Sequence, residues 1–372
     1  MIELSLLKSL NKGSKDERLS ALTRAAAHAS FPPVDPRMVN NHVHTTYSFS
    51  PYSPTAAVYA ARAEGLATCG IVDHDSMGGA REFIEAGKIV GIPTTIGVEA
   101  RVSFRETAFA DRRTNNPDQI GVSYLVLHAV PHENIEKVQA YFAPLRERRN
   151  VRNKEMIARI NALYADEGVS LDFERDVLPL SQFADGGSIT ERHLMLALAR
   201  QLLALGKAEL PEHATELEVL LAEYDLVGAL KKECIPKVFV PATEECPSLS
   251  EFVRFAASVN GILAYAYLGD VTSSVTGDKK AQKFEDDYLD ELFETIYDAG
   301  IRAVTYMPTR NTQPQLDRLR ALCERYGMLQ ISGEDINSPR QKFIIEKMRE
   351  EQFSNLIEST WQLIRHENGE RG

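Results

Sequence analysis

The sequence predicts an α/β fold in which parallel strands alternate with helices and can close into a TIM-like barrel. Seven short segments along the chain are almost continuously apolar, and each ends in polar, charged or aromatic side chains. Strands of this composition are typical of a parallel sheet that is buried on both faces. Segments with a helical period separate most of them, and this alternation is the order expected of an α/β fold.

These two patterns assign the individual elements. We expect strands over residues 40–44, 69–75, 94–101, 122–128, 261–267, 301–306 and 329–335. We expect helices over residues 55–64, 79–90, 134–141, 288–298 and 315–326. In a barrel of parallel strands the carboxyl ends meet on one face, where enzymes of this construction keep their chemistry.

Histidine and carboxylate side chains lie at these strand ends. His42 and His44 are two residues apart, so an extended strand would direct both imidazoles to the same side. For an isolated pair, two unrelated surface histidines are the simpler explanation. Here, however, the barrel would bring together His42, His44, His74, Glu99, His128 and Asp335. The sequence therefore predicts a site with imidazole and carboxylate ligands for a metal.

Five short motifs carry these residues. In chain order they are His42-Val43-His44-Thr45-Thr46-Tyr47-Ser48, Asp73-His74-Asp75, Gly97-Val98-Glu99, Arg192-His193 and Gly333-Glu334-Asp335. Over roughly residues 38 to 340 the set resembles the PHP (polymerase and histidinol phosphatase) domain family, in particular its stand-alone metal-dependent phosphoesterases. The resemblance implies a distorted seven-stranded (β/α) barrel with a helical insert. It also implies up to three bound divalent ions and hydrolysis of phosphate esters.

Several positions depart from the family pattern. Phe49 stands where the family has an aspartate, and a phenyl ring cannot bind a metal ion. Tyr267 and Asn337 stand where the family has histidines of its Ala-His-Pro and Asp-x-His motifs. A further family histidine aligns with Tyr124, although His128 lies four residues later on the same strand face and can substitute for it.

The resemblance sorts these residues into three metal positions. The first position, which is complete, takes His42, His44, Glu99 and Asp335. The second keeps Glu99 and at most one imidazole, from His128, and the third keeps only His74. We therefore expect one divalent ion, Mn²⁺, Zn²⁺ or Fe²⁺, with two ions as the alternative.

A site with one ion needs protein groups in place of the missing ions. We predict Arg192, His193 and His128 as catalytic residues. The guanidinium of Arg192 offers a fork to phosphate oxygens, and His193 can give a proton to the leaving oxygen. An ordinary surface charge remains the alternative for any single arginine.

The rest of the chain divides around the barrel. We expect an N-terminal helical extension over residues 1–37, the PHP barrel over 38–340 and a C-terminal helix over 341–372. A helical insert at about 142–235, which carries Arg192 and His193, would interrupt the barrel and cover the pocket as a lid. The N-terminal extension can pack against the barrel or support a homodimer.

Composition limits the partners. The 372 residues carry a formal net charge of -11, which argues against binding to a nucleic-acid polymer. The four cysteines show no paired metal spacing, and no signal peptide or membrane-spanning apolar run is evident. We therefore expect a cytoplasmic protein with a small phosphorylated substrate and no membrane contact.

Three functions fit these observations. The first is a metal-dependent phosphoesterase that acts on a small metabolite or nucleotide. The second is a ligand-binding or regulatory module that kept the barrel and one ion but lost turnover with the substituted ligands. The third is a hydrolase that cleaves C–N bonds, because barrels of this construction with one ion also do this.

Overall fold

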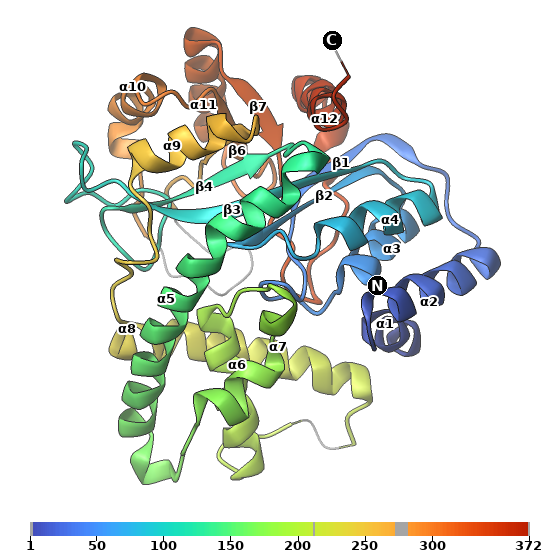
Figure 1. Ribbon diagram of the computed structural model, residues 1–372, viewed down its shortest axis with the longest axis vertical. Coiled ribbons are helices and arrows are strands. Elements are labelled where there is room, and N and C mark those ends of the chain that lie inside the picture. The colour runs from blue at the N-terminus through green and yellow to red at the C-terminus, as the bar shows by residue number, and fades with distance from the viewer. Residues whose placement is uncertain (1–2, 211–212, 272–281, 371–372) are drawn as a thin grey trace.

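The computed structural model describes residues 3–210, 213–271 and 282–370, and a seven-stranded sheet lies at its centre (Figure 1). The strands follow one another in the sheet in sequence order. They are β1 (Asp35–Val43), β2 (Leu66–His74), β3 (Thr94–Ser103), β4 (Val122–His128), β5 (Ile262–Ala266), β6 (Ala303–Tyr306) and β7 (Leu329–Ser332). All seven expected strands are confirmed.

The sheet curves into an almost closed barrel. Its last edge is joined to β1 by the segment that follows β7, where Val43 and Ile336 pair in parallel. Two backbone hydrogen bonds hold this junction, from the Ile336 N–H to the His42 carbonyl (3.1 Å) and from the His44 N–H to the Ile336 carbonyl (3.0 Å). The predicted TIM-like barrel is therefore confirmed.

The direction of β4 differs from the prediction. This strand is antiparallel to both β3 and β5, whereas all other neighbours in the sheet are parallel. Residues 104–121, which join β3 to β4, form turns without a helix. A β4 parallel to β3 would need a crossover, usually a helix, that carries the chain back to the end of the barrel where β3 begins. An apolar composition reports burial on both faces but not strand direction, so the expectation that all strands are parallel was wrong for β4.

Helices cover the outside of the barrel. The expected helices are confirmed as α3 (Pro54–Ala63), α4 (Ala80–Val90), α10 (Leu289–Asp298) and α11 (Gln313–Tyr326), and the structure adds α9 (Leu249–Ser258). Within the expected C-terminal helix of residues 341–372, the structure has α12 over Ser354–Glu367. The N-terminal extension contains α1 (Leu4–Asn11) and α2 (Lys15–His28). Gly13, with a positive φ of 84°, separates these two helices.

The insert leaves the barrel along one long helix. This helix, α5 (Ile135–Leu163), extends well beyond the expected 134–141 and leads from the sheet to α6 (Glu191–Ala204), α7 (Glu216–Glu233) and α8 (Ile235–Val238) (Figure 1). The insert has a hydrophobic core of its own, to which the barrel contributes Phe49. In the described part of the chain, no helix is long and apolar enough to cross a membrane.

A buried ion pair attaches the N-terminal extension to the barrel helices. Arg18 of α2 donates from Nε and Nη2 to the two carboxylate oxygens of Glu82 in α4, at 2.8 and 2.6 Å. The hydroxyl of Thr55 donates to the same carboxylate at 2.7 Å. The side chains of Arg18 and Glu82 are 5% and 1% exposed, so each depends on the other for its counter-charge.

We expect Arg18→Ala to lower the free energy of unfolding by about 3–5 kcal/mol, because it leaves the Glu82 carboxylate buried without a counter-charge. The matched control is Arg37→Ala, which removes a half-exposed partner of Asp35 and should change this free energy by less than about 1 kcal/mol. Urea denaturation at pH 7 measures both values. Equal effects of the two substitutions would contradict the assigned role of the buried pair.

Candidate metal centre

Four segments of the barrel bring five metal-binding side chains to one point. His42 lies near the end of β1 and His44 directly follows this strand. His74 ends β2 and pairs in register with Glu99 of β3. Asp335 follows β7, in the segment that closes the barrel against β1. Five of the six residues expected to converge are therefore adjacent in space.

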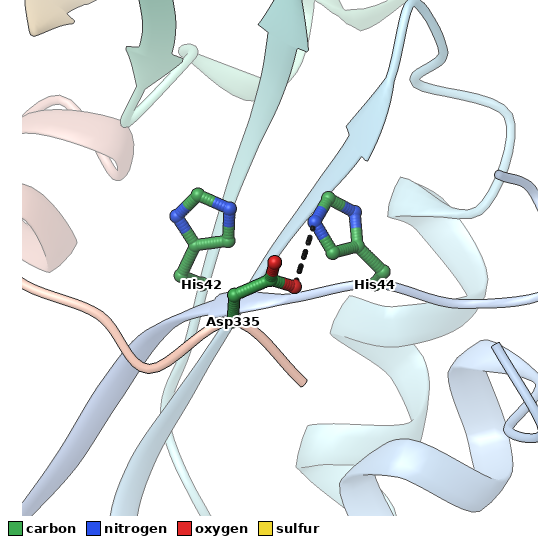
Figure 2. Close-up of side chains that lie close together, drawn as sticks. All are labelled: His42, His44 and Asp335. Atoms are coloured by element: carbon green, nitrogen blue, oxygen red, sulfur yellow. Dashed lines mark ion pairs between the residues drawn. The ribbon is translucent and has the colours of Figure 1, made fainter. Parts of the chain in front are cut away.

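One oxygen of Glu99 lies at the middle of this cluster. Its Oε2 atom is 3.1 Å from His74 Nδ1 and 3.6 Å from the Nε2 atoms of both His42 and His44. His44 Nε2 is also 3.3 Å from Asp335 Oδ1, on the side shown in Figure 2. The ligand atoms form two triplets within 4.8 Å, His42 with His44 and Asp335, and His44 with His74 and Glu99.

The cluster fits a divalent metal ion. His44 belongs to both triplets, and its Nε2 atom is buried without a hydrogen-bond partner although two carboxylates face it. A buried polar atom without a partner is costly and calls for an explanation, which a cation at this point would supply. Imidazole and carboxylate ligands suit Zn²⁺, Mn²⁺ or Fe²⁺.

The charges in the cluster depend on one another. Burial alone would lower the pKa of His44, but the Asp335 and Glu99 carboxylates raise it to about 9. Burial would raise the pKa of Glu99, but the neighbouring His42 and His74 lower it to about 2. Burial dominates at His74 and lowers its pKa to about 3. Without a metal ion, the site at neutral pH therefore holds a protonated His44 beside an ionised Glu99.

A small cavity lies between the ligands and the insert. Its walls combine barrel residues with residues of α5, α6 and α7, and its volume is about 40 Å³. The lining residues are His44, Phe49, His74, Asp118, Tyr124, Arg149, Thr190, Glu191, Arg192, Lys231 and Asn337. Sites for drug-sized ligands usually have about 300–1,000 Å³, so the insert is closed over the metal ligands in this conformation.

Buried ion pairs join the insert to the barrel beside His74. Glu191 of α6 accepts from Arg101 Nη1 of β3 at 2.9 Å and from Arg149 Nη2 of α5 at 3.0 Å, and Arg152 also pairs with it. The other end of Arg149 pairs with Asp75, next to the ligand His74, at 2.6 Å. These charged groups are nearly inaccessible to solvent, so each arginine depends on its carboxylate partners.

Comparison with known families agrees with this arrangement. The family model described as "PHP domain" matches residues 40–202, which include β1 to β4 and the first part of the insert. Over this range the chain is similar to the PHP domain family. Four of the five clustered ligands lie in this range, whereas Asp335 lies outside it. The comparison with curated proteins found no match to this sequence.

Two solved structures have a similar fold. One, from Bifidobacterium adolescentis, is named as a predicted metal-dependent phosphoesterase; the identity is 20%, the TM-score is 0.61, and 91% of this chain and 98% of that chain are covered. The other is named as an amidohydrolase from Chromobacterium violaceum, with bound sulfate and no metal; the identity is 19%, the TM-score is 0.57, and the coverages are 82% and 88%. At these identities the likeness shows the fold alone.

The residues at the substituted positions of the PHP pattern make other contacts. Phe49 packs into the hydrophobic core of the insert. The hydroxyl of Tyr267 donates to Asp286 at 2.6 Å. The amide of Asn337 donates to Asp335 Oδ1 at 2.7 Å, so it contacts a ligand of the metal centre.

The antiparallel direction of β4 changes the place of His128. The carboxyl end of β4 lies opposite Gly97, deeper in the barrel than Glu99, whereas Tyr124 at the other end lies opposite Arg101. Tyr124 consequently lines the cavity, and its ring centroid is 5.7 Å from that of His74. His128 is buried outside the cavity lining, and burial lowers its pKa to about 3. Its catalytic role stays a prediction.

Arg192 and His193 occupy different environments at the start of α6. Arg192 lines the cavity, and its charge contributes to a lowered pKa of Asp335. His193 is buried, and its Nδ1 accepts the backbone N–H of Thr190 at 3.0 Å, so the ring helps to cap its own helix.

Sequence reasoning missed several residues of the site. Arg149 and Lys231 line the cavity from helices of the insert, and Glu191 holds the arginines beside it. Their only signal in the sequence is a charged residue on a helix, which is indistinguishable from an ordinary solvent-exposed position. Asp73 directly precedes the ligand His74 in the motif Asp73-His74-Asp75, so the sequence did indicate that Asp73 supports the site.

Metal binding at pH 7 should release about one proton per ion. The expected source is His44, because its pKa of about 9 keeps it protonated without a metal and only the neutral imidazole can bind one. Proton release should fall towards zero as the pH rises through 9. Calorimetry of Zn²⁺ binding in buffers with different ionisation enthalpies measures the number of protons. A release that stays constant between pH 7 and 10 would contradict the protonation of His44.

Proposed function

We propose that the protein is a metal-dependent hydrolase that cleaves a phosphate ester of a small metabolite or nucleotide. The observation that carries the proposal is one cavity with metal-binding groups on the barrel side and cationic groups on the insert side. His44 and His74 line it from the barrel, and Arg192 and Lys231 line it from the insert. This pairing suits an anionic substrate whose reacting group lies at the metal ligands.

Each group has a defined task in this proposal. A divalent ion in the site supplies Lewis-acid polarisation of a phosphoryl oxygen and activation of water. His42, His44, Glu99 and Asp335 hold the ion, with His74 as an additional ligand next to Glu99. Arg192 and Lys231 bind the anionic substrate from above. Tyr124 has a phenol in the wall of the cavity, where it can donate a hydrogen bond to the substrate.

The closed insert sets the size of the substrate. A cavity of about 40 Å³ holds an ion and a water molecule but not a phosphate ester, so α6 or α7 must move for the substrate to enter. A site that is covered in this way favours a small molecule over a nucleic-acid polymer. After closure the insert excludes water from the reacting groups.

A second candidate is the hydrolysis of a C–N bond. The structural neighbour from C. violaceum is named as an amidohydrolase, and one ion with imidazole and carboxylate ligands can activate water for either reaction. The cations of the insert favour the phosphate ester, because the carbonyl group of an amide carries no charge that would pair with them.

Glu99→Gln should abolish both metal binding and hydrolysis. We expect a loss of more than about 100-fold in metal affinity, because even groups that only support a ligand contribute 10–100-fold. Elemental analysis and release of phosphate from a panel of phosphate esters measure the two effects. The matched control is Glu358→Gln, an exposed position of α12, which should retain both. A native protein that binds metal but hydrolyses neither esters nor amides would favour the binding module.

The variant Lys231→Met should distinguish a phosphoesterase from a hydrolase of C–N bonds. We expect KM for a phosphate ester to rise about 10-fold or more, since a hydrogen bond to a charged group contributes roughly 1.5–3 kcal/mol. The neighbouring Lys232→Met is the matched control, because that lysine is exposed and lies outside the cavity lining. An unchanged KM for esters, together with measurable cleavage of amides, would favour the C–N hydrolase.

A further inference from the structure

The turn formed by residues 45–49 touches both the metal centre and the insert. It directly follows the ligand His44 and precedes α3. Two backbone hydrogen bonds shape it, from Ser48 N–H to the Thr45 carbonyl at 3.0 Å and from Thr46 N–H to the Tyr52 carbonyl at 2.9 Å. These bonds fix the position of Ser48 relative to Thr45 and His44.

On its inner side the turn is bound to a buried carboxylate. Asp73 Oδ1 accepts from the backbone N–H of Thr45 and from the hydroxyl of Ser48, each at 2.6 Å. Asp73 Oδ2 accepts from the hydroxyl of Thr45 at 2.5 Å. Asp73 is 1% exposed, and these three short bonds replace the water that its carboxylate would otherwise bind.

Ser48 extends this contact to the metal ligand. Its Oγ lies 3.4 Å from His44 Nδ1. Because the Ser48 hydroxyl already donates to Asp73, its oxygen is left as an acceptor for Nδ1–H of His44. In the neutral imidazole this arrangement places the free lone pair on Nε2, which is the atom that faces Glu99 and Asp335. Ser48 therefore sets both the tautomer and the orientation of His44.

On its outer side the turn is bound to the insert. The ring of Phe49 packs edge-on against His193 of α6, with centroids 5.1 Å apart, and against Tyr224 of α7 at 5.4 Å. Phe49 is only 5% exposed, within the hydrophobic core of the insert. The carbonyl of Tyr47 accepts the backbone N–H of Ser188, also in the insert, at 2.7 Å.

We propose that residues 45–49 couple the seating of the insert to the metal affinity of His44, with Ser48 as the positioning residue. Ser48 and Phe49 are adjacent, so a displacement of Phe49 displaces the hydroxyl that orients His44. The seated insert buries Phe49 and keeps the imidazole aligned. When the insert is open, the Phe49 ring is exposed, the turn loosens and the affinity of His44 for the metal ion falls. This inference rests on the proposed metal centre.

The test compares Zn²⁺ affinities of full-length variants by competition with a chromophoric chelator. Ser48→Ala should weaken binding by about 10-fold or more, as is usual for groups that orient a metal-binding histidine, and Ser48→Thr should restore it. Phe49→Ala should also weaken binding, although this residue touches no ligand, whereas Phe49→Leu keeps an apolar side chain and should bind like the wild type. Leu205→Ala, at an exposed position of the insert, is the control.

A second variant tests the same contact without changing the turn itself. Tyr224→Ala disturbs the same contact from the insert side at a half-buried position, and circular dichroism with thermal melting shows whether each variant is folded. Folded Phe49→Ala and Tyr224→Ala proteins that bind Zn²⁺ like the wild type would overturn the coupling. Undiminished binding by Ser48→Ala would overturn the positioning role. Failure of the wild type itself to bind Zn²⁺ would reject the proposed metal centre instead.

Discussion

The position of one ionised carboxylate, that of Glu99, determines much of the architecture around it. Its Oε2 atom faces imidazoles from two strands and from the segment that follows β1, and burial leaves it no water to balance its charge. The group needs a positive partner, either a protonated His44 or a metal ion. The parallel register between β2 and β3 places His74 opposite Glu99. The closure of the barrel between Val43 and Ile336 then brings Asp335 to the other side of His44.

Buried charge also determines where the insert lies. Three arginines, from β3 and α5, share the carboxylate of Glu191 at the start of α6. Such networks contribute little net stability, because desolvation offsets much of the attraction, but breaking one pair leaves a buried charge without a partner. Their value here is geometric. A different placement of α6 would separate Glu191 from Arg101 and Arg149, so these pairs favour the closed position of the insert beside His74.

Local sequence and the resemblance to the PHP family predicted the barrel and the side chains that gather at the candidate metal centre. Each ligand follows or ends an apolar strand, and the spacing of residues within a strand fixes the side that it faces, so His42, Glu99 and Asp335 could be placed without coordinates. The direction of β4 could not be predicted, because the apolar residues of a strand that is buried on both faces do not indicate in which direction the chain runs. This error moved His128 away from the cavity and gave its place to Tyr124. The pairing of Arg149 and Glu191 was equally impossible to see in the sequence, because their partners lie 39 or more residues away.

The substitutions in the PHP pattern distinguish a remodelled site from a decayed one. A site that had merely lost its ligands would retain buried polar groups without partners, which are costly. One altered position, that of Asn337, instead makes a specific contact with a remaining ligand. Asn337 donates to the same oxygen of Asp335 that faces His44, so the former ligand position now orients a present ligand. Phe49 replaces a charged position with an aromatic ring that the insert buries. Asn337 therefore supports the geometry around His44 through Asp335, whereas Phe49 is linked to His44 only through the turn of residues 45–49.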